Sequence, residues 1–418
     1  MDLSDPTSPA ETAARTSYGR LLAILAAASG DITGSEDALA DAFERALTTW
    51  PRDGVPANPD GWLLTAARNR QRDGWKSAAH RTGVPLDPAV HAPTYFDDVD
   101  PDAVPDERLR LMLVCAHPAI DQAVHTPLML DVVLGCTAKQ IAQAFALPSS
   151  TLAARLGRAK KRIRDGHISF ELPDRSALPG RLDAVMTAVY GAFAIDWHST
   201  GTEMRDGLTG EALHLAETLC ALLPDNAEAH GLAALICLSV GRQPARYVDD
   251  ALVPLHQQDT TRWNSELLTR GEDHLRAAHA SATRGSPLGR FQLEAAIDAV
   301  HCARRRTGIT DWQHLASLHT ALQTIAPTLG GSVARAVVMS EIDGAAAGLD
   351  ILDEIGTDRP FQPAWAARAN LLHRLGRVDE AAAAYAKAIS LTPDAHTRRF
   401  LHRRLDALSS GDSPDSLA

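Results

Sequence analysis

The segment Thr137–Asp165, TAKQIAQAFALPSSTLAARLGRAKKRIRD, contains the most informative local pattern of the sequence. Its spacing predicts a first helix from Thr137 to Phe145, a short turn at Ala146-Leu147-Pro148, and a second helix from Ser149 to about Asp165. Thr137 and Ser149 are suited to cap the two helices. Ile141, Ala142, Leu147, Leu152 and Leu156 are spaced to pack the helices at a steep angle, which is the geometry of a helix-turn-helix motif.

The second helix of this motif is strongly basic. Between residues 151 and 165 there are six basic residues and one acidic residue. Such a patch neutralises phosphates, and residues near the start of the helix are placed to read base edges. We therefore predict a DNA-binding face made of Ser149, Ser150, Thr151, Arg155, Arg158, Lys160, Lys161 and Arg162. The alternative is a solvated basic helix in an ordinary bundle.

The whole chain has a composition typical of helical proteins. Its 418 residues suggest two to four domains, and aromatic residues make up only 5% of it. Alanine and leucine dominate, which favours helices over strands, so we expect an all-α protein. The formal net charge of −11 argues against nucleic-acid binding in general, but the basic residues are segregated into particular helices.

The N-terminal part predicts a three-helix module over residues 13–81, after a disordered tail at 1–12. The first helix runs from Ala13 to Ser29. The second begins at a capping box formed by Thr33 and Glu36. The third runs from Asn58-Pro59 to about Ala79. The third helix is basic and aromatic, a combination that suits unpaired DNA. It carries Trp62, Arg68, Asn69, Arg70, Arg72, Trp75 and Lys76. Trp62 lies beside Leu63 and Leu64, which favours a core position for its ring.

The second helix of this module is acidic instead. Glu36, Asp37, Asp41 and Glu44 accompany the apolar Leu39 and Phe43. Its face suits a basic partner protein, although a solvated face has the same composition.

Prolines and charges divide the rest of the chain. We predict an acidic linker at 82–105, a helical unit at 106–170 that includes the helix-turn-helix, a helical domain at 180–408 and a tail at 409–418. In the second unit, Pro118 and Thr126-Pro127 are expected to interrupt the helices, and Gly135 to end one.

One tetratricopeptide unit is clear in the C-terminal domain. Consensus positions of its 34-residue repeat are occupied by Trp365, Ala369, Leu372, Gly376, Ala381, Tyr385, Ala388 and Pro393. One looser copy lies around Ala336, Met339 and Leu352. Another runs from Ala212 through Pro224 to Gly241. Stacked repeats form a concave surface that binds a peptide or another domain, whereas a plain helical bundle would lack such a groove.

Together these segments resemble the extracytoplasmic-function RNA polymerase sigma factors of the sigma-70 family. SEDALADAFERAL (35–47) is similar to the region-2 helix that docks on the polymerase clamp helices. GWLLTAARNRQRD (61–73) looks like the adjoining helix that recognises the −10 element, and residues 106–170 look like region 4, which reads the −35 element. PDERLRLMLVCAHPAI (105–120), QLEAAIDAVHCARRR (292–306) and LLHRLGRVDEAAAAYAKAI (371–389) resemble a subfamily with a tetratricopeptide-type extension.

The resemblance implies roles for individual residues. Core polymerase would be contacted by Asp37, Leu39, Asp41 and Phe43, and the −10 DNA by Arg68, Asn69, Arg70 and Arg72. The loop Pro51–Pro59 would help to hold a flipped base. The segment Arg70–Trp75 departs from the Ile-Asp-Arg-Leu-Arg-Arg pattern that the family often shows. We hypothesise separately that the extension controls the sigma modules, because it lies on the same chain and no catalytic constellation explains its size. It would cap these modules, sense a protein or aid polymerase binding.

Other classes of function find less support. The five cysteines are scattered without a C-x-x-C pair, and the histidines show no ligand spacing, so we expect no disulfide, metal ion or cofactor and a reducing cytoplasm. There is no P-loop, dinucleotide motif or nucleophile elbow, so we expect no enzyme. No apolar stretch reaches membrane-spanning length and no signal peptide is evident. The alternatives are a helix-turn-helix regulator that acts without polymerase, and a scaffold whose repeats are its main function.

Overall fold

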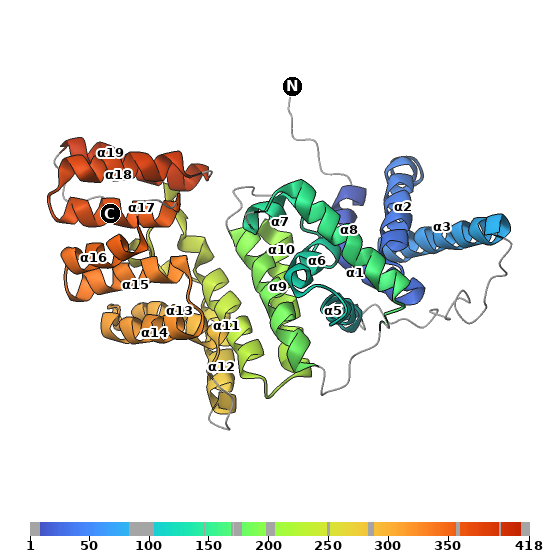
Figure 1. The fold of residues 1–418 in the computed structure, drawn as a ribbon, viewed down its shortest axis with the longest axis horizontal. Coiled ribbons are helices and arrows are strands. Elements are labelled where there is room, and N and C mark those ends of the chain that lie inside the picture. The colour runs from blue at the N-terminus through green and yellow to red at the C-terminus, as the bar shows by residue number, and fades with distance from the viewer. Residues whose placement is uncertain are drawn as a thin grey trace. The chain divides into compact units, whose positions relative to one another are not determined.

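The computed structural model describes residues 9–82, 104–145, 147–168, 170, 178–197, 205–248, 251–282, 288–356, 360–392 and 394–410. Within these ranges the chain is helical apart from one short strand pair and three 3-10 turns, so the expected helical fold is confirmed (Figure 1). Contacts divide the chain into two units, residues 1–197 with 203–215 and residues 198–202 with 216–418. Most of the predicted linker and most of both predicted tails lie outside the described residues. The predicted tail bounds are wrong where they can be compared, because residues 9–12 and 409–410 are helical.

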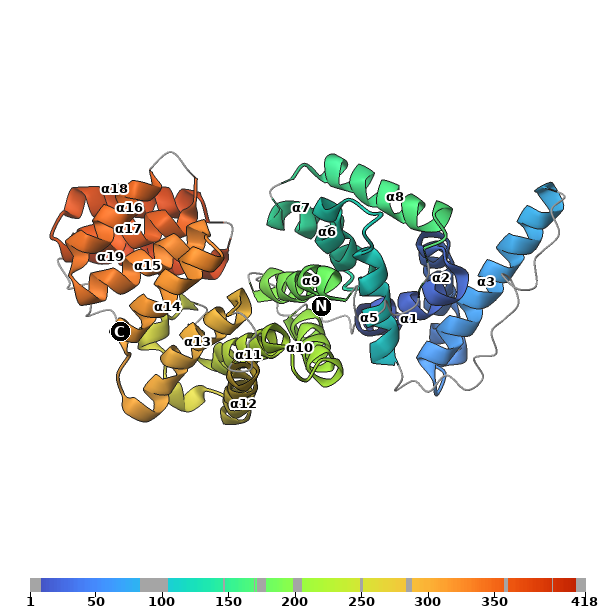
Figure 2. The same ribbon diagram turned by 60° about the horizontal axis from the view of Figure 1, so that its bottom comes forward.

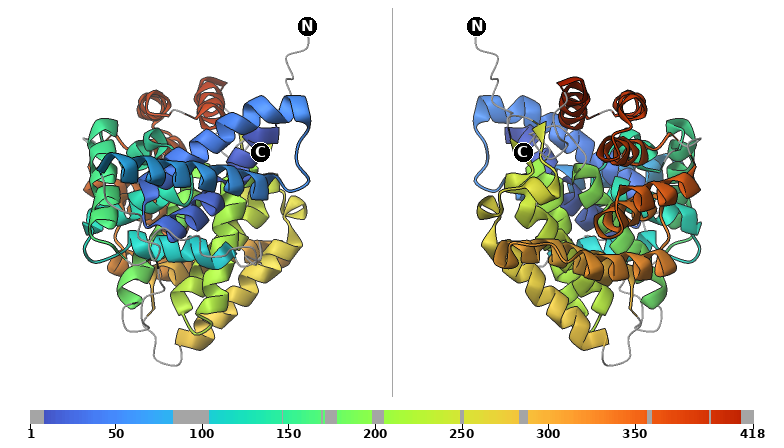
Figure 3. Two further views of the ribbon diagram at one scale, coloured as in Figure 1. Left: turned by 90° about the vertical axis from the view of Figure 1, so that its right-hand side faces the viewer. Right: turned by 90° about the vertical axis from the view of Figure 1, so that its left-hand side faces the viewer.

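The first unit begins with three helices, α1 (Pro9–Ser29), α2 (Ile32–Asp53) and α3 (Pro59–Thr82). They share a core in which Leu22, Leu39 and Leu63 are fully buried. Each such leucine contributes about 1.5–3 kcal/mol of hydrophobic stabilisation. Figure 2 shows α3 as a long helix whose far end extends away from α1 and α2, and these blue helices face the viewer in the left panel of Figure 3.

The predicted ends of these helices are confirmed in part. Asn58 caps α3, since its Oδ1 accepts the backbone N–H of Gly61 at 2.9 Å. The capping box at Thr33 and Glu36 is wrong, because α2 begins one residue earlier, at Ile32, with Asp31 in the cap position. Gly30, with φ of 68°, makes the left-handed turn that allows the chain to enter α2 there.

Four further helices follow in this unit: α5 (Val104–Cys115), α6 (Gln122–Val132), α7 (Ala138–Ala144) and α8 (Ser149–Asp165). Gly135 adopts a positive φ of 64° after α6. The break predicted at Thr126-Pro127 is wrong, because α6 begins at an Asp121 cap and includes Pro127 in its second turn. Burial of Val124, Leu128 and Leu130 on this helix outweighs the backbone hydrogen bond that proline cannot donate.

The first unit also contains α9 (Pro179–Trp197) and the start of α10 (Arg205–Leu222). The guanidinium of Arg181 on α9 donates to the carbonyl oxygen of Leu113 on α5 at 3.0 Å, and Gly191 brings α9 against Leu130. The buried carboxylate of Asp196 accepts the backbone N–H of Thr209 at 3.1 Å, which ties α10 to α9. Residues 179–197 therefore pack with the N-terminal unit, although the sequence predicted that the repeat domain starts at residue 180.

The second unit contains the end of α10, then α11 (Ala227–Arg242) and a non-α-helical segment that the sequence did not predict. This segment holds η2 (Gln243–Ala245), β1 (Tyr247–Val248), β2 (Ala251–Leu252), η3 (Leu255–Gln257) and η4 (Thr260–Arg262), and β1 pairs with β2 in antiparallel register. Arg304 holds it by donating to the carbonyl oxygens of Leu255 and Gln258 at 2.8 and 3.0 Å.

Helices α12 to α19 complete this unit, and the right panel of Figure 3 shows the orange and red helices that follow the yellow α12. Their bounds are α12 Ser265–Ala282, α13 Arg290–Thr307, α14 Trp312–Ile325, α15 Leu329–Ile342, α16 Ala345–Ile355, α17 Gln362–Arg374, α18 Val378–Ser390 and α19 Ala395–Ser410.

The tetratricopeptide pattern is expressed in the pair α17 and α18. Ala369, Ala381 and Ala388 are fully buried between the two helices, and Tyr385 fills the groove with only 2% of its surface exposed. Gly376, with φ of 72°, makes the turn between them. The looser copy upstream corresponds to α15 and α16, where Ala336 and Leu352 are buried. The copy predicted from Ala212 to Gly241 is not formed as such, because α11 packs mainly against α12 and α13.

Candidate nucleic-acid interface

The predicted helix-turn-helix corresponds to α7 and α8. A complete capping box starts α7: Thr137 Oγ1 accepts the N–H of Gln140 at 3.3 Å, and Gln140 Oε1 accepts the N–H of Thr137 at 2.8 Å. The predicted Ser149 cap is wrong, because Pro148 occupies the cap position of α8 and Ser149 is its first helical residue. Ser149, Ser150 and Thr151 are exposed at the start of α8, where the first backbone N–H groups of a helix have no partner within the helix.

The two faces of α8 differ in character. Leu152, Leu156, Ala159 and Ile163 are buried at helical spacing against the rest of the unit. Arg158, Lys161 and Arg162 are exposed on the outer side, and Arg155 is half-exposed. The structure thus brings together, on one side of a single helix, most of the basic residues that the sequence placed in a DNA-binding face. We call Arg155, Arg158, Lys161 and Arg162 the basic face of α8.

Lys160 is the exception. Its ammonium lies 2.5 Å from Glu36 Oε1 on α2 and 2.8 Å from Asp131 Oδ2 on α6, and its side chain is 13% exposed. Burial acts to lower the pKa of Lys160, but Asp131 and Glu36 outweigh burial and raise it, so the ammonium stays charged. Lys160 is therefore an internal ion-pair residue and leaves the predicted DNA-binding set. This ion pair could not be predicted from the sequence, since Glu36 lies 124 residues away.

The basic residues of α3 are partly engaged within the protein. Arg70 forms an ion pair with Asp41 of α2, so a residue predicted to bind DNA and one predicted to bind polymerase neutralise each other. Arg72 and Asn69 are exposed, and Arg68 and Trp75 are half-buried. The side chain of Lys76 lies outside the described residues.

Trp62 and Asn69 line an open hollow of about 410 Å³ at the side of α3. The Trp62 ring packs edge-on against that of Trp50 on α2, with centroids 5.6 Å apart. The remaining lining residues are Arg45, Asn58, Gly61, Thr65 and Ala66. The sequence did not single out Arg45 or Thr65, although Asn58, Gly61, Trp62, Thr65 and Asn69 recur at helical spacing and so share one face.

Two of the residues assigned to polymerase contact are in the core. Leu39 is fully buried, and Phe43 is 9% exposed with its ring stacked on that of Tyr18 at 6.4 Å. Neither side chain is available to a partner, so both assignments are wrong. The period of the apolar residues on α2 indicates its core face. The opposite side of α2 exposes Asp37, Glu44 and Leu47, the last with 47% of its surface accessible.

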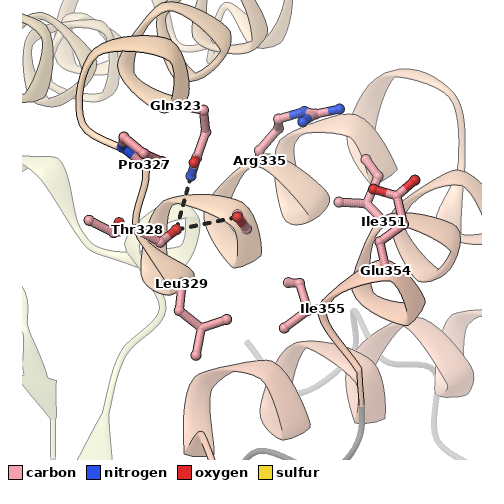
Figure 4. A pocket seen from close by; sticks show the side chains of 9 residues that line it. Gln323, Pro327, Thr328, Leu329, Arg335, Ile351, Glu354 and Ile355 are labelled. Carbon is pink, nitrogen blue, oxygen red and sulfur yellow. Dashed lines mark hydrogen bonds between the residues drawn. The ribbon is translucent and has the colours of Figure 1, made fainter.

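The repeat domain has a hollow of its own. A space of about 380 Å³ lies among α14, α15 and α16, and Figure 4 shows its lining side chains. Gln323 Nε2 donates to the carbonyl oxygen of Thr328 at 3.1 Å at one side. Arg335 and Glu354 offer opposite charges beside Ile351 and Ile355. The hollow thus combines apolar and charged groups.

Within the described residues, every helix is too short or too polar to cross a bilayer.

Comparisons with known proteins match two segments of the chain, the first of which spans residues from both units. Residues 181–279 match a family of unknown function (DUF6596), and residues 362–395 match the tetratricopeptide repeat. The latter range coincides with α17 and α18. No solved structure matches the chain. Uncharacterized protein R00370 of Rhizobium meliloti (strain 1021) is 32% identical over 385 residues, which is 90% of this chain and 90% of that protein. Since the similarity extends over nearly the whole of both proteins, the chain belongs to the same family as this Rhizobium meliloti protein.

Proposed function

We propose that this protein is a sigma factor, which binds core RNA polymerase and directs it to promoters. The observation that carries the proposal is the α7–α8 motif, in which a capped first helix supports a second helix with a buried apolar face and an exposed basic one. In helix-turn-helix proteins the second helix lies in the major groove and its N-terminal residues contact base edges. Ser149, Ser150, Thr151 and Arg155 would read the −35 element, and Arg158, Lys161 and Arg162 would grip phosphates.

The hollow beside α3 supports a role for the first three helices at the −10 element. Promoter opening exposes unpaired bases, which proteins bind by stacking them on aromatic rings within a basic groove. Trp62, Asn69 and Arg45 offer a ring, an amide and a cation around one open space. Arg68 and Arg72 would hold the adjacent backbone, and Arg70 would join them where its pairing with Asp41 is released.

The outer side of α2 is the proposed polymerase contact. Asp37, Glu44 and Leu47 combine negative charge with an exposed apolar group, which suits a basic partner helix. Asp41 would take part only after it separates from Arg70. The repeat domain would control these contacts by binding a protein partner or the sigma modules, with the hollow at Arg335 and Glu354 as its recognition surface.

The direct test is binding of the full-length protein to purified core RNA polymerase. The expected result is a complex that Asp37→Lys/Glu44→Lys weakens, because these changes reverse the charge of the proposed contact. The control Asp343→Lys reverses an exposed charge in the repeat domain and should leave core binding unchanged. Binding of duplex promoter DNA without any affinity for core would instead favour a helix-turn-helix regulator that acts without polymerase.

A further inference from the structure

Two histidines and a cysteine from three helices meet in the second unit. His230 lies in the first turn of α11, His274 lies on α12, and Cys220 lies near the end of α10. The potential ligand atoms of these three residues all lie within 4.8 Å of one another. Nδ1 of His230 is 3.1 Å from Nδ1 of His274.

The hydrogen bonds of His230 determine which of its nitrogens is free to bind a ligand. Its Nε2 lies 3.1 Å from the carbonyl oxygen of Pro224. A carbonyl oxygen can only accept, so Nε2 carries the proton and Nδ1 presents a lone pair toward His274. A ligand histidine in a metal site is held in the same manner, with its second ring nitrogen donating to a backbone carbonyl.

The spacing of the donor atoms fits a tetrahedral ion. Zinc–nitrogen bonds of about 2.0–2.1 Å place two nitrogens about 3.3 Å apart, and a zinc–sulfur bond of about 2.3 Å places the sulfur about 3.6 Å from each nitrogen. The two imidazoles therefore already stand within a few tenths of an ångström of this arrangement. The thiol of Cys220 has to approach by no more than about 1.2 Å.

The surrounding packing holds the three ligands in place. Gly271, three residues before His274, permits α12 to approach α11 closely, since a Cβ there would lie 2.7 Å from Leu238 Cγ. Arg270 on α12 forms an ion pair with Glu217, which is one turn before Cys220 on α10. The ligand-bearing faces of α10 and α12 are thus connected beside the site.

A transition metal binds neutral imidazoles and a thiolate, which are the forms that His230, His274 and Cys220 would present to it. A divalent ion supplies the positive charge that stabilises a thiolate at this position.

We propose that Cys220, His230 and His274 form a zinc-binding site. One thiolate and two imidazoles are the ligand types that select Zn²⁺ over Mg²⁺ or Ca²⁺. On binding, the Cys220 thiol releases its proton to solvent as the sulfur–zinc bond forms, and the proton on Nδ1 of His274 moves to Nε2. Water occupies the fourth position. The inference is independent of the proposed sigma activity, and all three ligands lie within the segment that matches the family of unknown function.

The test is metal binding by the full-length protein, with Co²⁺ as a spectroscopic probe for Zn²⁺. The wild type is expected to bind about one equivalent and to show the ligand-field bands of tetrahedral cobalt with a sulfur-to-cobalt charge-transfer band. Cys220→Ser should abolish the charge-transfer band, and His274→Gln should weaken binding at least about 100-fold, more than loss of an outer-shell partner does. His279→Gln, an exposed histidine on the same helix, and Cys302→Ser, a buried thiol elsewhere in the unit, serve as matched controls and should behave as wild type.

Zinc should also raise the thermal midpoint of the second unit in the wild type and the controls, as any ligand specific for the folded state does. Wild-type protein that shows no charge-transfer band at micromolar Co²⁺ would overturn the proposal whether or not the variants fold. A band that persists in Cys220→Ser would overturn the assignment of the sulfur ligand, and with it the site. Circular dichroism of each variant separates loss of a ligand from loss of the fold.

Discussion

Lys160 on the basic helix α8 donates a 2.5 Å hydrogen bond to Glu36 on the acidic helix α2. The same ammonium reaches Asp131 on α6, so one cation joins three helices of the first unit. The proposed −35 reader is thereby attached to the helix whose outer side is the proposed polymerase contact.

Replacing Lys160 should destabilise the first unit without removing a DNA contact. Lys160→Met leaves two partly buried carboxylates without their cation, which we expect to cost about 2 kcal/mol of unfolding free energy. Lys161→Met, at the adjacent exposed position, should change stability by less than about 0.5 kcal/mol but weaken DNA binding. Urea unfolding and DNA affinity of both variants provide the comparison. If both variants lost the same DNA affinity and Lys160→Met left the stability unchanged, Lys160 would belong to the DNA-binding residues after all.

The cost of Lys160→Met should shrink in acid. Burial already raises the pKa of Glu36, and Lys160 opposes this rise, so loss of Lys160 raises that pKa further. A carboxyl whose pKa is higher in the folded than in the unfolded state binds more protons when folded, and stability then increases as the pH falls. Unfolding midpoints at pH 7 and pH 5 should therefore show a smaller difference between wild type and variant at the lower pH. A constant difference would contradict the coupling of Glu36 to Lys160.

The basic face of α8 should set the salt dependence of DNA binding. Each phosphate contact that is removed lowers the slope of log affinity against log salt by about 0.9. Arg158→Ala and Arg162→Ala should each reduce the slope by about this amount, because both side chains are exposed on α8. Arg305→Ala, an exposed arginine on α13, is the control and should leave the slope unchanged. If the slope of log affinity against log salt did not change in the α8 variants, α8 would be a solvated helix that does not contact phosphates.

Gly19 marks a close approach between α1 and the chain that follows α6. A Cβ at Gly19 would overlap the carbonyl oxygen of Val133, whereas a Cβ at Gly74 on α3 would meet nothing within 4 Å. Gly19→Ala should cost about 1–3 kcal/mol through overpacking, despite alanine's better helix propensity. Gly74→Ala should stabilise α3 by up to about 1 kcal/mol. Thermal unfolding of the Gly19→Ala and Gly74→Ala variants distinguishes these effects. A stabilising Gly19→Ala would mean that α1 and the chain that follows α6 separate readily.

A partly buried histidine should make the second unit sensitive to acid. Burial lowers the pKa of His301 to about 4, and its ring packs edge-on against Trp312 with centroids 6.3 Å apart. Between that value and the ordinary pKa near 6.5, the unfolded chain binds a proton that the folded chain does not, so stability falls as the pH falls. His301→Gln should remove about 2 kcal/mol of this loss between pH 7 and pH 5. Parallel pH profiles of the two proteins would show that His301 is protonated in the folded state.

The helices of this protein follow closely from local sequence. Thr137, Asn58 and Gly376 act where their chemistry predicts, because capping and left-handed turns depend on a few adjacent residues. The errors have local causes too. Pro127 was expected to break α6, but the helix starts close enough before it for the proline to cost a single hydrogen bond.

Contacts between distant residues could not be predicted in the same way. Lys160 belongs to a basic run whose other members are exposed, and only the folded chain brings Glu36 and Asp131 to it. The three residues of the proposed zinc site show no short ligand spacing, since 44 residues separate His230 from His274. Leu39 and Phe43 follow the apolar period of α2 and could have been assigned to the core from the sequence alone.

The central claim, promoter-specific initiation, is tested most directly by mapping transcription start sites produced by purified core RNA polymerase on genomic DNA, with and without the full-length protein. The account predicts a defined set of start sites that depends on the protein. These starts should be lost in the Arg155→Ala/Arg158→Ala double variant while its affinity for core polymerase remains. Start sites that are the same in the presence and absence of the wild-type protein would contradict the account.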